Sequence, residues 1–305
     1  MSLLALTGAT GFVGSAVLAE ALAQGHQVRA LARRDQQPRA EVEWVRGDLD
    51  AGDALAALVA GADAVIHVAG LTNTPDPAQF EAANVTGTAN VIAAMKQSGA
   101  GRLVFVSSLS AREPQLSAYG ASKAQAEALV EASGLDWTTV RPPGVYGPRD
   151  IDYLDMFRTA KWGFVPLPPG GASSIIHADD LATLLVALAL SNAAPTKKKV
   201  YEPDDGREGG WSHKELAQAI GQAVGKRSVF APHLPRAVLD AAATADRLIR
   251  GDRAKLTADR VGYMAHPNWV SRFDRRPPPG IWQPRITGEE GLKATAEWYR
   301  REGWL

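Results

Sequence analysis

The stretch LLALTGATGFVGSAVLAEAL, residues 3–22, decides the fold of this chain. It joins a short apolar, β-prone run through a glycine-rich turn to an amphipathic helix pattern. Gly8 permits the tight turn, Gly11 lets backbone N–H groups approach a pyrophosphate, and Gly14 lets the helix pack closely on the strand. Three glycines alone describe any glycine-rich turn, but a strand before them and a helix after them predict a dinucleotide site. We expect cofactor contacts from Gly8, Thr10, Gly11, Phe12, Val13 and Gly14.

Short β-prone runs alternate with alanine-rich amphipathic segments up to about residue 142. Gly25, Gly61, Gly99 and Gly134 stand where helices would end in the left-handed conformation. The alternation predicts the α/β class, as a parallel sheet with helices on both faces that binds its ligand beyond the carboxyl ends of the strands. Strands are expected at residues 3–7, 27–32, 42–46, 64–69, 102–107 and 137–141, and helices at 12–25, 51–61 and 80–99.

The sequence after Arg141 is rich in loops and prolines. One more helix is expected at about 178–192 and one more strand at 198–203, before helical stretches that alternate with proline-rich loops. This pattern predicts a smaller, mainly helical C-terminal substrate domain. The sheet domain would comprise residues 1–145 with about 173–203, and the substrate domain about 146–172 with 204–305.

Composition argues against several classes of function. The 305 residues include 33 Lys plus Arg and 33 Asp plus Glu, so the formal net charge is zero and no basic stripe points to nucleic acid. Cysteine is absent, which excludes disulfides and thiolate chemistry and fits a reducing compartment. The N-terminus lacks a signal-peptide pattern, and the most apolar segment, 181–190, is about half a membrane span long. We expect a cytoplasmic protein with no membrane or nucleic-acid partner.

The residues after the second strand bear on the choice of dinucleotide. NAD sites usually place an acidic residue there for the ribose 2′-OH, whereas this chain has Ala32 followed by two arginines, the first of them Arg33. A guanidinium suits a 2′-phosphate, so the sequence favours NADP(H) over NAD(H). Asp35 nearby, and the alternative of a solvated basic turn, leave this choice open. Asp48 and Leu49, after the third strand, are expected at the adenine edge.

Tyr119 and Lys123 stand four positions apart in SAYGASKAQAE, residues 117–127. Positions i and i+4 share one helix face, so the ammonium can lie beside the phenol. A free phenol has a pKa of about 10, and a nearby cation lowers that pKa because it favours the phenolate. In most helices such a pair is a surface contact, but next to a dinucleotide it becomes a candidate for proton transfer.

A series of motifs resembles the extended short-chain dehydrogenase/reductases, in that family's order and at its spacing, over about the first 190 residues. The resemblance is specific for fold and cofactor class and much less specific for the reaction. The last hundred residues or so resemble the family's variable substrate domain only loosely. The motifs are TGATGFVG (7–14), GDL (47–49), HVAG (67–70), NVTGT (84–88), FVSS (105–108), YGASK (119–123), RPPGVYGP (141–148) and HADDLA (177–182).

The resemblance implies a Rossmann-type, doubly wound parallel sheet and a metal-free site with a hydride donor or acceptor. Tyr119 would pass a proton to or from the substrate oxygen while a hydride moves at the nicotinamide, and Lys123 would reach both Tyr119 and the nicotinamide ribose. Ser108 would donate a hydrogen bond to the substrate oxygen, with Ser107 and Ser110 competing for that role. Further cofactor contacts are implied for Val68, Ala69, Gly70, Pro142 and Val145, together with Tyr119 and Lys123.

Other polar residues lie in the same motifs. Asn84 matches the position that supports the lysine, often through water, although it could also bond within its own helix. His67 is expected to be structural or near the cofactor backbone, because a tyrosine makes a histidine base unnecessary. His177 and the two aspartates that follow it would begin a packing helix, and no metal site is expected.

Two departures from the family patterns bear on the reaction. Epimerases often carry an asparagine where this chain has Gly144, and dehydratases tend to have acidic residues where Leu109 and Ser110 stand. We therefore expect an NADP(H)-dependent oxidoreductase that interconverts a carbonyl and an alcohol on a small, fairly apolar substrate, with Tyr119 as general acid/base. One alternative is an NAD-dependent nucleotide-sugar epimerase or dehydratase. Another is a non-catalytic nucleotide-binding protein, structural or regulatory, related to an accessory subunit of respiratory complex I, although this chain retains Tyr119 and Lys123.

The same family frequently dimerises through the two long helices that here would begin near Phe80 and Tyr119. Their alanine-rich faces would suit close packing in a homodimer, and burial inside the monomer would produce the same sequence pattern.

Overall fold

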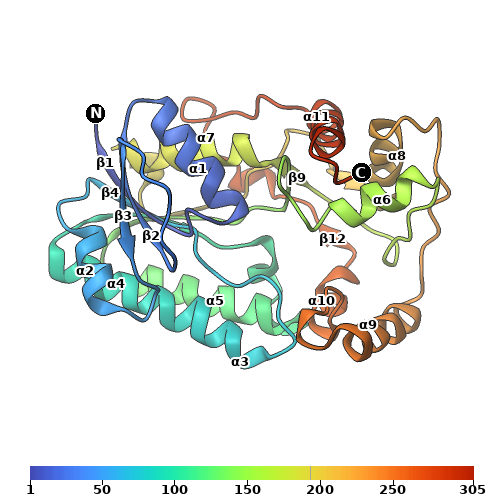
Figure 1. The fold of residues 1–305 in the computed structure, drawn as a ribbon, viewed down its shortest axis with the longest axis horizontal. Coiled ribbons are helices and arrows are strands. Elements are labelled where there is room, and N and C mark those ends of the chain that lie inside the picture. The colour runs from blue at the N-terminus through green and yellow to red at the C-terminus, as the bar shows by residue number, and fades with distance from the viewer. Residues whose placement is uncertain (193) are drawn as a thin grey trace.

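A computed structural model describes residues 1–192 and 194–305, so Ala193, within the expected 173–203 segment, lies outside the described residues. Its centre is a seven-stranded sheet in the order β10-β6-β5-β4-β1-β2-β3, with every neighbouring pair parallel (Figure 1). This arrangement confirms the predicted Rossmann-type sheet. The strands are β1 (Leu3–Thr7), β2 (Gln27–Ala32), β3 (Val42–Arg46), β4 (Ala64–His67), β5 (Arg102–Val106), β6 (Asp136–Val140) and β10 (Lys199–Tyr201).

Helices cover both faces of this sheet (Figure 1). The strands are apolar on both sides: Leu4 and Leu6 belong to the core beneath one helix layer, and Ala5 between them belongs to the core beneath the other. Helices α1 (Phe12–Ala23) and α7 (Ala178–Leu190) form the first layer, and α2 (Gly52–Val59), α4 (Gly87–Ser98) and α5 (Ala118–Ala132) form the second. All four glycines expected to end helices have positive φ: 77° at Gly25, 65° at Gly61, 75° at Gly99 and 79° at Gly134.

The helix expected at 80–99 is three consecutive helical segments. A short helix α3 (Pro77–Phe80) runs into a π-helical segment, η1 (Glu81–Thr86), which continues as α4. Asn84 is a buried residue of this π segment. π-helical turns are rare and are frequently found at functional sites, and this one lies beside the predicted catalytic pair.

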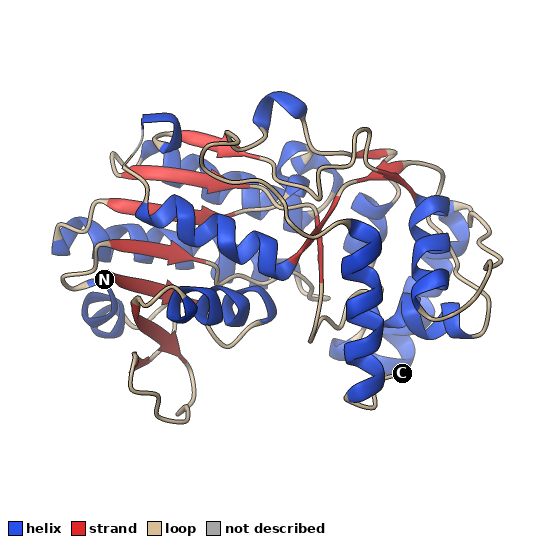
Figure 2. Cartoon of the chain, turned by 90° about the horizontal axis from the view of Figure 1, so that it is seen from above, coloured by secondary structure: helices blue, strands red, loops and turns tan. Residues whose placement is uncertain are grey.

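A helical lobe follows the sheet, at the side of the carboxyl ends of the strands (Figure 2). Its core joins α6 (Leu154–Lys161), α8 (His213–Ala223) and α11 (Gly288–Arg301) around aromatic side chains such as Tyr146, Phe157 and Tyr299. Capping boxes begin two of these helices, at Ser212 with Glu215 and at Thr287 with Glu290. Short strands link the lobe to the sheet domain: β7 (Gly144–Tyr146) with β9 (Ile175–His177), and β8 (Ala172–Ser173) with β11 (Trp211–Ser212) and β12 (Asn268–Trp269).

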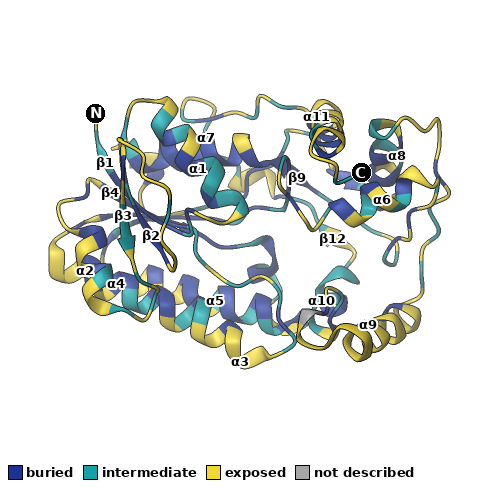
Figure 3. Cartoon of the chain, in the orientation of Figure 1, coloured by how far each residue is buried: buried dark blue, intermediate teal, exposed yellow. Residues whose placement is uncertain are grey.

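Helices α9 (Arg236–Arg250) and α10 (Ala258–Met264) form a hairpin that lies next to the start of α5 (Figure 1). Its own small apolar cluster has Leu239, Ala243 and Val261 at its centre. Most of α9 is exposed (Figure 3), including Leu248 and Ile249 at its C-terminal end. The 3-10 segments elsewhere are η2 (Leu109–Arg112), η3 (Pro114–Leu116), η4 (Ala194–Thr196), η5 (Gly251–Arg253) and η6 (Phe273–Arg275).

The helices were compared with the length and apolar content of a membrane span. Among residues 1–192 and 194–305, no helix combines the length and the apolar content that crossing a bilayer requires.

Candidate active site

The glycine loop has the geometry that a dinucleotide-binding turn requires. Gly8 has a φ of 77°, and a Cβ there would lie 2.7 Å from the backbone N of Ala69, at the end of the neighbouring β4. A Cβ on Gly14 would lie 2.0 Å from the carbonyl oxygen of Gly8, so only glycine lets α1 pack this closely on the turn. The mechanical roles assigned to these two glycines from the sequence therefore match the backbone geometry.

The N-terminus of α1 is open to an anion. Gly11 is its N-cap residue and supplies no capping side chain, and the first turn carries no acidic residue. Thr10 and Gly11 are exposed, while Phe12 and Val13 are partly exposed. Because the first N–H groups of a helix have no intrahelical partner, this end can hold a pyrophosphate. The loop therefore fits the phosphates of a nicotinamide dinucleotide.

The residues expected at the adenosine end lie on exposed loops after β2 and β3. Arg33 is exposed and forms no ion pair with another residue of the described chain. Asp35, which complicated the sequence argument, pairs instead with Arg46 across 3.1 Å. Asp48 accepts a hydrogen bond from the backbone N of Asp50 at 3.0 Å, which shapes the turn after β3.

Leu49 is fixed against α4. Its carbonyl oxygen accepts a hydrogen bond from Asn90 Nδ2 at 2.9 Å. Its side chain lies over Gly87, where a Cβ would come within 2.6 Å of Leu49 Cδ1. The leucine therefore has a fixed position at the expected edge of the adenine.

The segment after β4 brings the expected cofactor contacts next to the catalytic candidates. Ala69 N donates to Thr7 Oγ1 at 3.1 Å, which ties the turn after Val68 to the end of β1. A Cβ on Gly70 would lie 2.9 Å from Asn84 Oδ1 and 3.1 Å from Lys123 Nζ. Thr7 pairs with His67, so β1 and β4 end side by side. The turn after β4 therefore lies between the glycine loop, which follows β1, and Lys123.

Lys123 is a buried cation. Its ammonium donates to the carbonyl oxygen of Val106 at 3.0 Å and lies 5.4 Å from the ring centre of Phe105. Burial lowers the pKa of Lys123 to about 8, and the nearby Glu127 opposes that shift. The ammonium is therefore held at the carboxyl end of β5.

Tyr119 is a buried phenol between two aromatic rings. Its ring centre lies 5.7 Å from that of Phe80 and 6.1 Å from that of Tyr263. Burial raises the pKa of Tyr119 well above its ordinary value, and hydrogen bonds with Ser108 and Ser110 only partly oppose this rise. The expectation that a cation lowers this pKa is wrong, because desolvation dominates. Tyr119 is a neutral phenol at neutral pH.

Ser108 is arranged to donate. Its Oγ accepts hydrogen bonds from Ser110 N at 3.2 Å and from Ser110 Oγ at 3.0 Å. Since a hydroxyl oxygen has two acceptor sites and one hydrogen, these contacts leave the Ser108 hydrogen for its hydrogen bond with Tyr119. Ser110 contacts both Ser108 and Tyr119, whereas Ser107 Oγ is buried with no hydrogen-bond partner among the described residues.

Asn84 joins the turn after β4 to helix α5. Its Oδ1 accepts from Leu71 N at 2.7 Å, and its Nδ2 donates to Leu71 O at 3.0 Å and to Ser122 Oγ at 2.9 Å. The amide thus uses direct contacts with its neighbours, and its carbonyl oxygen borders the same space at Gly70 as the Lys123 ammonium. Asn84 supports the surroundings of Lys123 by holding this turn in place.

The motif at 141–148 contains the expected cofactor contacts Pro142 and Val145, and its Gly144 has a neighbour that the sequence did not suggest. Pro142 O accepts from Leu109 N at 3.1 Å, and Val145 lies in β7. A Cβ on Gly144 would lie 2.1 Å from the Tyr153 hydroxyl oxygen. The space of the asparagine that epimerases often carry is therefore filled by a tyrosine from a later segment.

The two histidines of the motifs have structural contacts. His67 Nδ1 is 2.6 Å from Thr7 Oγ1 and its Nε2 is 3.1 Å from Thr88 Oγ1, and burial lowers its pKa to about 3. His177 is the N-cap of α7 and accepts from Asp179 N at 3.2 Å. In the part of the chain that the structure describes, no cluster of three or more His, Cys, Asp or Glu could hold a metal ion.

Sequence reasoning missed the residues that reach this site from the C-terminal half. Asp259 and Tyr263, both on α10, contact Ala118 and Tyr119. Nothing in the local sequence around α10 marks them, because the contact spans 140 residues or more and depends on how the hairpin packs.

Comparison with known proteins gives the family. The NAD(P)H-binding family model matches residues 8–192. The chain is 34% identical over 313 residues to a ceramide reductase of Caulobacter vibrioides, covering 99% of this chain and 95% of that protein. It is 30% identical over 325 residues to a 2-alkyl-3-oxoalkanoate reductase of Stenotrophomonas maltophilia, covering 94% and 96%. Its fold resembles a UDP-glucose 4-epimerase of Thermus thermophilus in complex with NAD, with a TM-score of 0.69 and 22% identity, covering 98% and 99%.

The sheet, the glycine loop and these relatives define a nicotinamide-dinucleotide enzyme built on a Rossmann-type fold. The chain belongs to the NAD(P)H-binding family, in the extended short-chain dehydrogenase/reductase group that includes the epimerases and dehydratases. It is an NAD(P)-dependent oxidoreductase, as the sequence predicted.

Proposed function

We propose that this enzyme is an NADPH-dependent reductase of a ketone carried on a long apolar chain. The observation that carries the proposal is the buried, neutral Tyr119 beside Ser108, its hydrogen-bond partner. A neutral phenol and a hydroxyl donor suit a carbonyl oxygen that must gain a proton. The reaction adds a hydride to the carbonyl carbon and a proton to its oxygen.

Each protein group has one role in this proposal. Bound NADPH would supply the hydride. Ser108 would hold the carbonyl oxygen by a hydrogen bond, and Tyr119 would transfer its phenolic proton to that oxygen as the alcohol forms. Lys123 would stabilise the resulting phenolate until a proton from solvent restores the phenol. Asn84 would keep the turn after β4 in position around Lys123.

The apolar substrate class is supported by the relatives and by the surroundings of the tyrosine. The relatives named above are a ceramide reductase and a 2-alkyl-3-oxoalkanoate reductase, and both align over nearly their whole length. The rings of Phe80 and Tyr263 flank Tyr119, so a substrate beside the phenol would meet apolar surface. A nucleotide sugar suits this site less well, because Tyr153 fills the space at Gly144.

The decisive experiment measures NADPH oxidation with a panel of ketones that differ in chain length. We expect kcat/KM to rise with the alkyl chain, because each buried CH₂ contributes about 0.8 kcal/mol. UDP-glucose and UDP-galactose serve as the contrasting probes. Interconversion of these sugars in the presence of NAD⁺, with no net change in the oxidation state of the cofactor, would establish epimerase chemistry instead. Tight NADPH binding with no turnover of any substrate would favour a structural or regulatory protein.

The preference for NADP(H) over NAD(H) is part of this proposal and rests on Arg33. Replacing Arg33 with Ala is expected to weaken NADPH binding roughly 10- to 100-fold, the scale of a hydrogen bond to a charged group. NADH binding should hardly change, because NADH lacks the 2′-phosphate. Tryptophan-fluorescence titration of both cofactors measures this difference. Equal losses for NADPH and NADH, or none for either, would remove Arg33 from the 2′-phosphate site.

The lowered pKa of Lys123 gives a prediction about pH. The ammonium is present below about pH 8 and is lost above it, because burial lowers the pKa of Lys123 to about 8. We expect kcat/KM for ketone reduction to fall as the pH rises through that value, since kcat/KM reports the free enzyme.

The Lys123→Arg variant is the matched test of this pH dependence. A guanidinium does not lose its proton in this range, so any activity that the variant retains should not fall near pH 8. A variant with the same descending limb as the wild type would assign that limb to another group.

A further inference from the structure

Helix α10 is seated on the first residues of α5, the helix that carries Tyr119. Asp259 Oδ1 accepts a hydrogen bond from Ala118 N at 2.5 Å, and Asp259 Oδ2 accepts one from Tyr119 N at 3.4 Å. Gly262 lies against the residue before the N-cap of α5, where a Cβ would come within 2.4 Å of Leu116 O. Three separate contacts of α10, including the Tyr263 ring, therefore reach residues 116–119.

These contacts complete the hydrogen bonding at the start of α5. The first N–H groups of any helix have no acceptor within the helix. Ser117 is the N-cap residue, and its Oγ accepts from Gly120 N at 2.9 Å while its carbonyl oxygen accepts from Ala121 N at 3.0 Å. The N–H groups of Ala118 and Tyr119 donate to the carboxylate of Asp259, which lies at least 140 residues later in the chain. A carboxylate here also opposes the positive end of the helix dipole.

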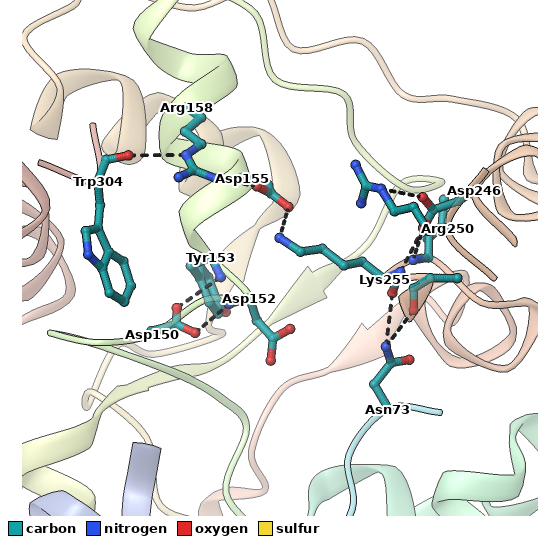
Figure 4. A network of polar contacts seen from close by, with 12 residues as sticks. Asn73, Asp150, Asp152, Tyr153, Asp155, Arg158, Asp246, Arg250, Lys255 and Trp304 are labelled. Carbon is teal, nitrogen blue, oxygen red and sulfur yellow. Dashed lines mark hydrogen bonds and ion pairs between the residues drawn. The ribbon is translucent and has the colours of Figure 1, made fainter. Parts of the chain in front are cut away.

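Polar contacts outside α5 also join the hairpin to the rest of the protein. Figure 4 shows one of them, in which Lys255 Nζ lies 2.8 Å from Asp155 Oδ2. In addition, Asn73 Nδ2 donates to Ala254 O at 3.2 Å. Arg260 Nη1 adds an ion pair with Asp152 at 3.0 Å. The carboxylates of both ion pairs are about half exposed and the apolar cluster of the hairpin is small, so these contacts contribute little to stability.

We propose that Asp259 is a positioning residue that couples the α9–α10 hairpin to Tyr119. This inference rests on the proposed reductase function. When the hairpin is seated, Asp259 fixes the backbone of Tyr119, and with it the direction in which the phenol points toward the substrate oxygen. When the hairpin lifts, the first turn of α5 loses two acceptors and the phenol loses its fixed direction. Helix α10 thus orients the proton donor of the sheet domain.

The test compares Asp259→Ala, Asp259→Asn and Asp240→Ala in steady-state kinetics with NADPH and a turned-over ketone. Asp240 is the matched control, an aspartate of the same hairpin whose only ion pair in the described chain is with Arg236 at 3.8 Å. Asp259→Ala should lower kcat about 10- to 100-fold, the scale of misplaced reacting groups, and leave the Kd of NADPH unchanged. Asp259→Asn keeps one acceptor oxygen for Ala118 N and should restore much of kcat. Asp240→Ala should match the wild type.

A second variant probes the same contact sterically. Gly262→Ala places a Cβ against Leu116 O and should lift α10 from residues 116–119, with a loss of kcat like that of Asp259→Ala. A lower Tm with full kcat in both variants would show that the contact is only structural and would overturn the proposal.

Amide hydrogen exchange separates this proposal from the proposed function. Asp259→Ala should speed exchange at Ala118 and Tyr119 and spare Gly120, whose acceptor is Ser117. If the wild type turns over no ketone, the reductase function fails, while faster exchange at these two amides still supports the coupling. Unchanged exchange at both amides would overturn the coupling whatever the activity.

Discussion

Tyr119→Phe is expected to lower kcat for ketone reduction at least about 100-fold while NADPH binds normally. The substitution removes the proton donor and keeps the ring, which packs between Phe80 and Tyr263. The effect should appear in kcat and kcat/KM together, because the phenolic proton moves only in the transition state. Stopped-flow measurement of a single turnover, with fluorescence titration of NADPH, separates the chemical step from cofactor binding.

The control for this prediction is Tyr153→Phe. Tyr153 is also a buried phenol, and burial raises its pKa as well, but its hydroxyl lies against Gly144 rather than beside Ser108. It should retain most of the wild-type kcat. A Tyr119→Phe enzyme as active as the wild type would end the assignment of Tyr119 as proton donor.

Glu202→Ala is expected to lower the free energy of unfolding by about 3–5 kcal/mol. Glu202 follows β10 and is fully buried. Its Oε2 lies 3.2 Å from Arg112 Nη1 and accepts from Arg272 N at 3.0 Å, and its Oε1 lies 3.6 Å from Arg141 Nη1. Removing the carboxylate leaves Arg112 without an ion-pair partner among the described residues, whereas Arg141 keeps Glu127, whose Oε2 lies 2.5 Å from Arg141 Nη2. An unpaired buried charge costs more than the ion pair contributed.

Urea unfolding followed by tryptophan fluorescence measures this loss. Asp35→Ala is the contrasting variant, because Asp35 and its partner Arg46 are both largely exposed, and it should change stability by about 1 kcal/mol or less. Glu202→Gln keeps the shape but loses the charge and should fall between the two. A loss below about 1 kcal/mol in Glu202→Ala would show that water or Glu127 compensates the arginines.

The parts of the fold that follow local rules could be predicted from the sequence. The sheet strands are buried on both faces, so their apolar runs are continuous and easily found, and the glycines after the helices have positive φ for a purely local steric reason. The glycine loop could also be predicted, because its three glycines are required by contacts within one strand–turn–helix unit.

The remaining features depend on contacts between distant residues. Nothing local indicates that Tyr153 fills the space at Gly144, or that Asp259 caps the helix of Tyr119. The pKa of Tyr119 also depends on burial by Phe80 and Tyr263, which spacing within one helix cannot reveal. The π segment at Asn84 was missed because its composition is that of an ordinary helix.

The contact between Gly144 and Tyr153 constrains how this site can change. An asparagine at 144 would collide with a tyrosine side chain that is itself packed against Tyr146, so that substitution alone is blocked. Replacing Tyr153 with a smaller residue first would leave a cavity beside Tyr146, and such a cavity lowers the free energy of unfolding. Each substitution is unfavourable without the other, which is strong epistasis between two positions nine residues apart. An evolutionary path between the two versions of this motif must therefore change both residues or cross a less stable intermediate.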